Sequence, residues 1–443
     1  MSKEIQQTGH DPKVSVIMAV YNAASYLEQS IGSLLDQTFT DYEILCVDDG
    51  STDESCDVIN GLIDVHPNGS RIRLLHTSHV GVGEARNIAL QQARGQYIAF
   101  LDSDDYADPK MLEKAVTKAD DTRADIVIWD VWFMDHKSGQ EIYPPVGTLN
   151  FHYFDDGSGT FSYEKNPDYI FTSFQNWVWN KLFRRDFLKE NDIKFPNLAR
   201  TEDLEFTCLA LVEAKRIAVI YERLVKYRIN RGSSNMDTVD LHPLDFLTAF
   251  VDLKEELVRR GIYQNVRMSY INWALSSALF NLSTQARYET FLSVFNALRD
   301  YGFRQMDITD QLTREDIQNE AWWNEYQTML ASTPEELLLH YLRDTRRNEA
   351  FFICELNKAD REKNKLSQTI NTLNQTVQEQ QEHVTELKTA LEHEQETARH
   401  ERKMHEHWEH KAQATRNSIT FKVGRIVIFP LHAVKRLVQA IRR

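Results

Sequence analysis

The chain has 443 residues, of which 42% are apolar, and it carries a formal net charge of -15. A chain of this length can bury more than one hydrophobic core, so we expect several domains. The acidic balance argues against general nucleic-acid binding, because such a protein needs a basic surface to displace the counterions of the phosphate backbone. We therefore expect no nucleic-acid partner.

The N-terminal sequence MSKEIQQTGHDPK is polar and lacks the apolar core of a signal peptide. No run of about 18 apolar residues marks a membrane span. The four cysteines show no spacing typical of a disulfide framework or a zinc motif, which fits a reducing compartment. We expect residues 1–12 to be a polar tail on a cytoplasmic protein.

From residue 14 onward, short apolar runs rich in β-formers alternate with helical patterns. The expected strands are VSVIMAV, YEILCV, RIRLLH and YIAFL. This alternation predicts an α/β fold, with a mostly parallel sheet and helices on both faces. Because ligands bind at the carboxyl ends of such strands, the polar clusters at residues 19–22, 48–51 and 102–105 are expected to converge on one rim.

The segment FLDSDDYADP holds four aspartates directly behind an apolar run. Like charges at this spacing repel one another, but a divalent cation between them removes the repulsion. Asp102 and Asp104 form a short Asp-x-Asp, which is sufficient for Mg²⁺ or Mn²⁺ arriving with a diphosphate. Taken alone, so short a motif is more often structural, and we expect Asp108 to cap a helix that begins at Pro109.

The second half of the chain predicts further elements. Residues 124–133 are expected to form a strand, NWVWNKLFRRDFLKEN a helix, and RIAVIYERLVKYRI the extended structure that closes the domain. Residues 239–345 have an apolar period near 3.6, which predicts a helical subdomain.

Residues 346–415 carry a heptad pattern. The seam residues are Leu356, Ile370, Val377, Val384 and Leu391 at position a, and Leu366, Leu373 and Leu387 at position d. β-branched residues at a with Leu at d favour a parallel two-stranded coiled coil, so we expect a homodimer or higher oligomer. The alternative is a single long helix that packs on its own domain.

Residues 416–443 contain several Lys and Arg residues and no carboxylate. Apolar and basic residues interleave, which indicates an amphipathic helix, interrupted at Pro430, on an anionic membrane surface. Docking onto the acidic part of the same chain is the alternative. We expect the protein to be peripheral on the inner face of the cell membrane.

Three stretches of this sequence resemble glycosyltransferase family 2, the inverting, nucleotide-sugar-dependent transferases of the GT-A fold, and in particular the bacterial surface-glycan type. They are VSVIMAVYNAASYLEQSIGSLLDQTFTDYEILCVDDGSTDES, GVGEARNIALQQARGQYIAFLDSDD, and WNKLFRRDFL with TEDLEF. They occur in the family's order, so together they are far more specific than any one motif. The resemblance implies a GT-A domain over residues 13–238.

The resemblance also implies the roles of individual residues. Those expected to bind the nucleotide are Ala19, Tyr21, Asp49, Arg86 and Asp102. Asp104 would ligate the Mn²⁺ or Mg²⁺ with help from Asp102, and Asp105 would play a supporting role. Without the resemblance, a turn, a helix cap or a surface ion pair would explain most of these residues.

Inverting transfer needs a base that removes the proton of the acceptor hydroxyl. The resemblance implies that Asp203 in TEDLEF is this base, with Glu202 beside it, although acids there also suit a helix N-terminus. Further candidates for contact with the acceptor or the leaving group are Trp177, Trp179, Lys181, Arg228 and Arg231.

We therefore expect a metal-dependent inverting glycosyltransferase. It would move a sugar from a nucleotide-diphosphate donor, expected to be a UDP-sugar, to a hydroxyl of a saccharide or lipid-linked acceptor in surface polysaccharide synthesis. The alternative is a non-catalytic, membrane-associated coiled-coil scaffold with a vestigial transferase domain. A nucleotidyltransferase would need a glycine-rich phosphate loop, which AVYNAASY lacks.

Overall fold

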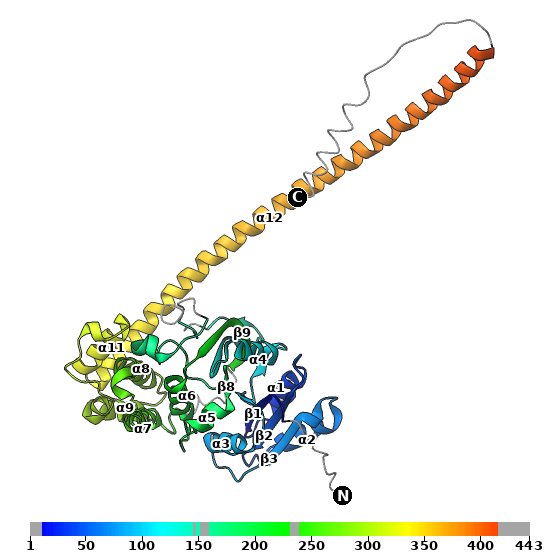
Figure 1. The fold of residues 1–443 in the computed structure, drawn as a ribbon. Coiled ribbons are helices and arrows are strands. Elements are labelled where there is room, and N and C mark those ends of the chain that lie inside the picture. Colours follow the sequence, from blue (N-terminus) through cyan, green and yellow to red (C-terminus); the bar gives the residue numbers. More distant parts are fainter. Residues whose placement is uncertain (1–10, 145–147, 151–158, 231–238, 415–443) are drawn as a thin grey trace. The chain divides into compact units, whose positions relative to one another are not determined.

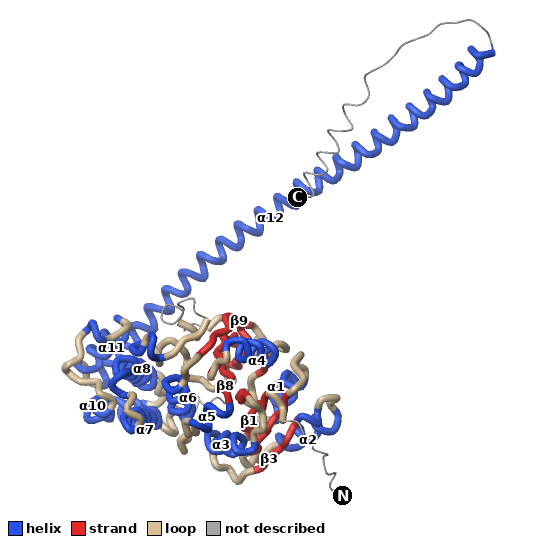
Figure 2. Tube along the Cα trace, in the orientation of Figure 1, coloured by secondary structure: helices blue, strands red, loops and turns tan. Residues whose placement is uncertain are grey.

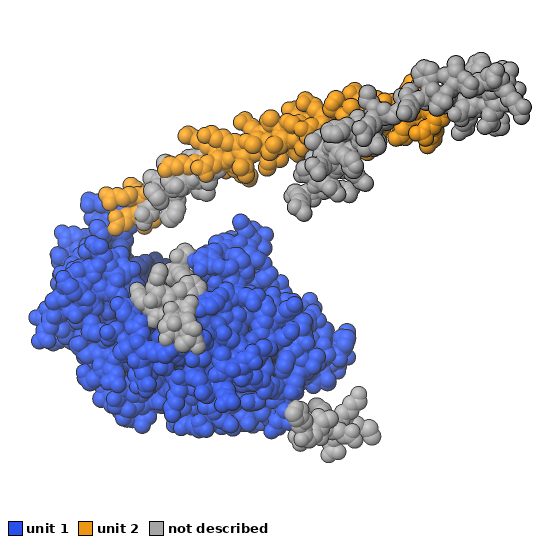
Figure 3. Space-filling model, turned by 45° about the horizontal axis from the view of Figure 1, so that its top comes forward, with its two compact units in different colours: residues 1–343 blue, residues 344–443 orange. Residues whose placement is uncertain are grey.

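The structure of this protein is a computed structural model (Figure 1). It describes residues 11–144, 148–150, 159–230 and 239–414, so Arg231 and the basic segment 416–443 lie outside the described residues. The chain divides into two compact units, Met1–Arg343 and Asp344–Arg443 (Figure 3). The ranges expected for the transferase domain (13–238) and the helical subdomain (239–345) lie within the first unit, except for residues 344 and 345.

A mixed β-sheet forms the centre of the first unit (Figure 2). Its described strands are β1 (Val14–Val20), β2 (Tyr42–Asp48), β3 (Ile72–His76), β4 (Tyr97–Phe100), β5 (Tyr106–Ala107), β6 (Ile126–Asp135), β7 (Glu141–Ile142), β8 (Lys181–Arg184) and β9 (Ile217–Ile229). They follow the order β3-β2-β1-β4-β8-β6-β9-β5, and β7 pairs with β6.

The strands β3, β2, β1 and β4 form a parallel half-sheet, as the βαβ pattern predicts. Neighbouring residues of a strand point to opposite faces, and here both faces are apolar. In β1, Val16 and Met18 belong to one buried hydrophobic cluster and Ile17 to another. Continuous apolar runs therefore suit these strands, because protein covers both sides of the sheet.

The other half of the sheet is mixed, and one sequence-based expectation for it is wrong. Lys181–Arg184, expected to be helical, is the strand β8, which pairs antiparallel with both β4 and β6. Only Arg185–Glu190 is helical there. Leu182 and Phe183 are both buried and belong to different hydrophobic clusters. Pairing between two strands distant in sequence therefore outweighs the local helical pattern.

Helices surround the sheet and continue beyond it. They are α1 (Ala24–Leu35), α2 (Ser55–Val65), α3 (Val82–Gln92), α4 (Met111–Thr122), α5 (Arg185–Glu190), α6 (Glu202–Glu213), α7 (Asp245–Arg259), α8 (Tyr263–Ser283), α9 (Tyr288–Ala297), α10 (Phe303–Gln305), α11 (Glu320–Ala331) and α12 (Pro334–Ala414). One hydrophobic cluster contains Phe100 of the sheet, Phe206 of α6 and Phe250 of α7. The helices after residue 239 therefore share a core with the sheet.

Helix α4 begins later than the sequence predicts. Its first residue is Met111, and Lys110 occupies the N-cap position expected for Asp108. The Oδ1 atom of Asp108 accepts a hydrogen bond from the backbone N–H of Lys110 at 2.9 Å. Asp108 therefore shapes the turn that leads into the helix and does not cap it directly.

Helix α12 is a continuous helix of 81 residues. Seven seam side chains of the predicted heptads are exposed: Leu366, Ile370, Leu373, Val377, Val384, Leu387 and Leu391. An apolar stripe on an otherwise polar helix has a cost in water unless something covers it. Among the described residues, no helix is long and apolar enough to cross a membrane.

The junction between β1 and the turn before β4 provides a test of this fold. A Cβ atom added at Gly95 would lie 2.3 Å from the backbone nitrogen of Ser15, closer than atoms can approach. We expect Gly95→Ala to destabilise the protein by about 1–3 kcal/mol, as overpacking does. The midpoint of thermal unfolding measures this effect.

Gly32 in α1 supplies the control, because a Cβ added there meets nothing within 4 Å. Gly32→Ala should leave stability unchanged or raise it by roughly 0.5–1 kcal/mol, the usual preference of a helix for Ala over Gly. Equal midpoints for Gly95→Ala and the wild type would contradict the close approach of Gly95 to β1.

Candidate active site

The carboxyl ends of β1, β2 and β4 lie side by side. In the parallel register, Val20 pairs with Asp48, and Ile17 pairs with Phe100. Ala19 lies on β1 and is partly buried against one of the hydrophobic clusters. The structure therefore brings the three polar clusters that follow these strands to one edge of the sheet.

A carboxylate cluster lies just after β4. Asp102, Asp104 and Asp105 each offer an oxygen atom, and these atoms all lie within 4.8 Å of one another. Asp104 and Asp105 are buried, whereas the Asp102 side chain is 32% exposed. The Asp105 Oδ2 atom is buried and accepts no hydrogen bond from the described residues. Burial and the charge of Asp102 raise the pKa of Asp105 well above its usual value.

Close-packed carboxylate oxygens are the ligands that Mg²⁺ and Mn²⁺ prefer, so these side chains fit the predicted cation. The sequence pointed to Asp102 and Asp104 and gave Asp105 only a supporting role. Its buried oxygen makes it a third candidate ligand.

Arg86 links this cluster to a distant part of the chain. Its guanidinium is buried and donates from Nη2 to Asp102 Oδ1 at 2.8 Å and from Nη1 to Glu202 Oε1 at 2.7 Å. It also lies over the ring of Phe195, 5.3 Å from the centroid. Both ends of the guanidinium fork are thus engaged within the protein. The contact with a nucleotide expected for Arg86 remains a prediction.

The acid pair Glu202 and Asp203 begins α6. Thr201 immediately before it has a φ of 64°, in the left-handed region that β-branched residues rarely occupy. Strained backbone of this kind persists only where the surrounding structure holds it, and it is frequent at functional sites. The two carboxylates therefore lie at a rigid, strained helix start.

The pKa of Asp203 is raised to about 7, first by burial and then by the negative charge of Glu202. Asp102 raises this pKa further, while Arg86 and Lys181 lower it. A carboxyl group with a pKa near neutrality can exchange a proton under physiological conditions, which is the property required of a general base.

Lys181 lies inside the protein. Its ammonium group donates hydrogen bonds to the carbonyl oxygens of Gln175 and Trp177 at 2.7 and 2.6 Å, and to Asn180 Oδ1 at 2.8 Å. Burial lowers its pKa to about 7. All three ammonium donors are used within the segment 175–181, so the described contacts of Lys181 are structural. Its predicted contact with the acceptor has no support in this geometry.

Trp177 and Trp179 form part of an aromatic stack. Their ring centroids are 4.7 Å apart, and Trp179 lies 5.1 Å from Tyr227 with the ring planes 3° apart. Trp179 is buried, whereas Trp177 is only partly buried. Of these two candidates for contact with the acceptor, Trp177 is therefore the more exposed.

Arg228 is a buried residue that stabilises the carboxylate loop, the segment after β4 that carries Asp102, Asp104 and Asp105. Its backbone N–H donates to Asp105 Oδ1, and its Nε donates to the carbonyl oxygen of Asp104, both at 2.8 Å. Its Nη2 donates to Gln29 Oε1 at 2.6 Å, and the residue is buried. These contacts hold the loop in place, and they differ from the phosphate contact expected for Arg228.

Tyr21 and Asp49 occupy the rim beside β1 and β2. Tyr21 is 48% exposed, and its ring stacks on His79 with centroids 4.2 Å apart. The buried Asp49 accepts hydrogen bonds from the backbone N–H groups of Val80 and Gly81 at 2.7 and 2.9 Å. Asp49 therefore shapes the loop that carries His79. The sequence carried no signal for His79.

A parallel half-sheet with a cluster of carboxylates at its strand ends, linked to a second acid pair, defines a GT-A-like nucleotide-sugar fold. Residues 15–190 match the family model described as "Glycosyl transferase family 2". The match runs from β1 to α5 of the first unit.

Curated relatives carry similar names. The chain is 32% identical over 223 residues to "Uncharacterized glycosyltransferase EpsJ" of Bacillus subtilis, covering 50% of this chain and 62% of that protein. It is 27% identical over 304 residues to the "Poly(ribitol-phosphate) beta-N-acetylglucosaminyltransferase TarS" of Staphylococcus aureus, covering 65% of this chain and 49% of that protein. The match thus spans between about half and three fifths of these relatives.

A solved structure is also similar. The crystal structure of residues 1–349 of S. aureus TarS in complex with UDP-GlcNAc has a TM-score of 0.53 and 25% sequence identity, covering 66% of this chain and 81% of that one. The fold of the first unit is therefore shared with a protein that was crystallised with a nucleotide sugar.

The Arg86 bridge can be tested by substitution. Arg86→Met would leave Asp102 and Glu202 without their shared partner, and breaking a buried pair costs about 3–5 kcal/mol. We expect a correspondingly lower midpoint in urea unfolding. Adding Glu202→Gln to Arg86→Met should recover part of the loss, because one uncompensated charge is removed.

An exposed pair supplies the control. Arg259 pairs with Glu256 on the surface of α7, and its own side chain is 67% exposed. Arg259→Met should change stability by less than about 1 kcal/mol. Similar losses for the Arg86 and Arg259 variants would contradict a central role for the Arg86 bridge.

Proposed function

We propose that this protein is a metal-dependent inverting glycosyltransferase that takes a sugar from a UDP-sugar. The acceptor would be a hydroxyl of a saccharide or lipid-linked molecule in surface polysaccharide synthesis. The Arg86 bridge is the observation that supports this most strongly, because it joins the carboxylate loop to the α6 acid pair. Oxygen ligands for a cation and a carboxyl group of near-neutral pKa thus belong to one charge network.

The donor half of the site would be formed by the rim and the carboxylate loop. Asp102, Asp104 and Asp105 would hold Mg²⁺ or Mn²⁺. When bound, this ion supplies positive charge that neutralises the leaving diphosphate. Tyr21 offers an exposed ring on which a nucleotide base can stack, and Asp49 holds the loop beside it. The UDP-GlcNAc bound to the staphylococcal relative supports UDP as the nucleotide.

The acceptor half would depend on α6. Asp203 would accept the proton of the acceptor hydroxyl as that oxygen attacks the anomeric carbon on the face opposite the leaving group. Glu202 would keep Arg86 in position and so keep the acid pair attached to the donor half. The partly exposed ring of Trp177 would offer a flat apolar face to a sugar of the acceptor.

Substitutions of two carboxylates distinguish the proposed base, Asp203, from the proposed metal ligand, Asp104. With a panel of nucleotide sugars and Mn²⁺ or Mg²⁺, Asp203→Asn should lower transfer by about 10²–10⁴-fold, the usual contribution of a general base, while nucleotide binding persists. Asp104→Ala should weaken the metal-dependent binding of the nucleotide itself. Transfer assays and calorimetry measure the two effects.

The dependence on pH adds a second measurement. Asp203 must be ionised to act, and its pKa is raised to about 7, so wild-type turnover should rise through about pH 7 and then level off. Asp186→Asn serves as the control, because that side chain is 68% exposed on α5. Undiminished turnover by Asp203→Asn would remove Asp203 as the base.

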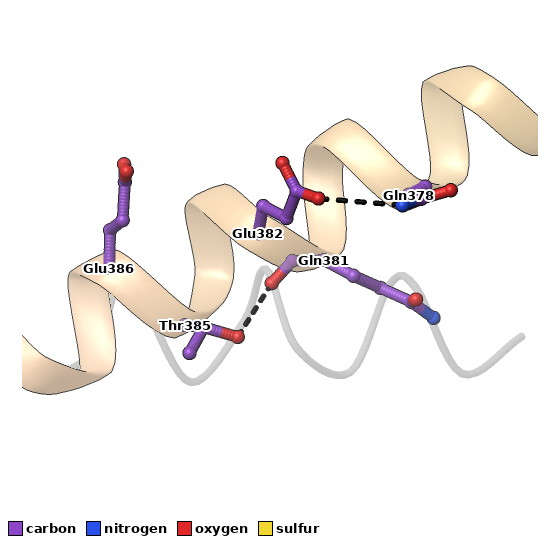
Figure 4. Close-up of a pocket in the computed structure, with 5 residues that line it drawn as sticks. All are labelled: Gln378, Gln381, Glu382, Thr385 and Glu386. Atoms are coloured by element: carbon purple, nitrogen blue, oxygen red, sulfur yellow. Dashed lines mark hydrogen bonds between the residues drawn. The ribbon is translucent and has the colours of Figure 1, made fainter.

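We also propose that two copies of the chain associate through α12. The support is the exposed apolar seam, in which Ile370, Val377 and Val384 are each about half exposed in the single chain. The neighbouring face is polar (Figure 4): Gln378 donates to Glu382 Oε1 at 3.5 Å, and the Thr385 hydroxyl donates to a backbone carbonyl. An apolar seam beside a polar face is the pattern of a coiled coil.

Placing charges on the seam tests this association. Val377→Lys with Val384→Lys should convert the dimer to a monomer in sedimentation experiments, because lysines at both positions would face each other across the seam. Gln378→Lys with Thr385→Lys, one residue further along and away from the seam, should leave the dimer intact. A wild-type chain that sediments as a monomer would contradict the proposal.

The basic segment 416–443, which lies outside the described residues, is proposed to bind an anionic membrane and to hold the enzyme at the inner face of the cell membrane. Its cations and interleaved apolar residues support this. Deleting residues 418–443 should release the protein from anionic liposomes in a sedimentation assay and leave transfer to a soluble acceptor unchanged. Undiminished sedimentation of the truncated protein with liposomes would rule out this role.

A further inference from the structure

A second group of metal-binding side chains lies at the ends of β2 and β3. Asp48, Cys56 and His76 each offer one ligand atom, and these three atoms all lie within 4.8 Å of one another. Asp48 and His76 are the last residues of their strands and are paired in the parallel register. Cys56 lies in the first turn of α2. Three separate elements therefore bring a carboxylate, a thiol and an imidazole together.

The geometry distinguishes this group from a proton relay. The Nδ1 atom of His76 lies 3.4 Å from Asp48 Oδ2 and 4.0 Å from Cys56 Sγ. In a nucleophile–histidine–acid relay, the histidine uses one ring nitrogen for the nucleophile and the other for the acid. Here the same nitrogen faces both partners. This arrangement is typical of ligand atoms that surround one common centre, such as a metal ion.

The two separations measured from His76 Nδ1, 3.4 Å to Asp48 and 4.0 Å to Cys56, are close to those around a tetrahedral zinc ion. Bonds of about 2.3 Å to sulfur and about 2.0–2.2 Å to nitrogen or oxygen place neighbouring ligand atoms roughly 3.3–3.7 Å apart. The separation of 4.0 Å between His76 Nδ1 and Cys56 Sγ would have to shorten by only a few tenths of an ångström. The His76 side chain is 61% exposed, so an ion can enter from solvent and a water molecule can complete its coordination.

The surroundings favour a cation. Ser51 donates its backbone N–H to Asp48 Oδ1, which leaves Oδ2 directed at His76. The negative charges of Asp53 and Asp57 also act on Cys56. A divalent ion would offset this local surplus of negative charge.

We propose that Asp48, Cys56 and His76 bind Zn²⁺ or a similar borderline-soft divalent ion, at a site separate from the carboxylate loop. Sulfur and imidazole ligands select such ions, whereas the all-oxygen cluster of Asp102, Asp104 and Asp105 suits Mg²⁺ or Mn²⁺. The two sites therefore differ in the metal that they select. This inference does not depend on the proposed transferase activity.

The site has a structural consequence for the rim. The backbone N–H of Thr77 donates to the carbonyl oxygen of Asp48 at 2.9 Å. Asp49, which follows Asp48, accepts hydrogen bonds from the backbone N–H groups of Val80 and Gly81. An ion bound by Asp48 and His76 would tie together the two strand ends from which this loop leaves. Zinc would thus stabilise the loop that carries His79 against Tyr21.

Cobalt substitution of the full-length protein tests the proposal. Co²⁺ added in the presence of excess Mg²⁺ should give one tetrahedral site with a thiolate-to-cobalt charge-transfer band in the near ultraviolet, and Zn²⁺ should abolish the band. Cys56→Ser should lose the band, and His76→Ala should weaken cobalt binding at least tenfold. Zn²⁺ should raise the unfolding temperature of the wild type and not that of Cys56→Ser.

Two control variants make the result specific. Asp104→Ala, in the all-oxygen cluster, and Cys354→Ser should both keep the charge-transfer band. Binding through histidines elsewhere in the chain would give cobalt spectra without a thiolate band. The absence of that band in the wild type, or its persistence in Cys56→Ser, would overturn the proposal.

Cys56 and His76 are both at least partly exposed, so the Cys56→Ser and His76→Ala variants are expected to fold. Circular dichroism verifies this. Even if a variant fails to fold, a wild-type cobalt spectrum without the thiolate band overturns the proposal. A transferase assay decides the proposed function independently.

Discussion

The candidate site depends on one buried guanidinium. Arg86 pairs with Asp102 at the end of the parallel half-sheet and with Glu202 at the start of α6, two acids a hundred positions apart in the chain. A planar fork of donors can serve two carboxylates at once, which a lysine ammonium on its flexible stem does less well. The loop after β4 and the start of α6 are therefore held at one spacing by a single side chain.

Several unfavourable features gather around this bridge. Thr201 has a left-handed backbone, and the pKa values of Asp105 and Asp203 are both raised by burial. Each feature has an energetic cost, because a buried acid or a strained φ is avoided where packing alone matters. Arg228 compensates in part, because its backbone N–H and its Nε donate hydrogen bonds to Asp105 and Asp104. Such concentrations of strain and shifted pKa values are typical of functional sites.

The matched family region and the candidate site do not have the same limits. The family model ends at residue 190, while Asp203, Tyr227 and Arg228 lie beyond it. Glu202 beside Asp203 contacts Arg86, Tyr227 contacts Trp179, and Arg228 contacts the carboxylate loop, all of them in the matched region. The shared hydrophobic cluster extends further still, into α7 and α8. The first unit therefore needs the segment after residue 190 to complete both its core and its site.

Local patterns were sufficient for the parallel half of the fold. The apolar runs of β1, β2 and β4 and the acids that follow them were identifiable in the sequence. A strand buried on both faces is a short, continuous run of apolar residues, and polar residues mark its end. The sequence also pointed to Asp102 and Asp104 as metal ligands and to Asp203 as the base, through the resemblance to a family. These predictions name the residues expected to bind the metal or to act as the base, but they do not say what each residue contacts.

Tertiary structure alone decided the contacts. Lys181 belongs to a strand and is buried, and Arg228 bonds to the carboxylate loop, because pairings distant in sequence override local propensity and leave no periodic trace. Asp48, Cys56 and His76 likewise follow no motif, since α2 and the register of β2 with β3 bring them together. The sequence alone determined which residue types stand at the strand ends. Only the folded chain decided which of them meet, because their spacing is set by packing between elements.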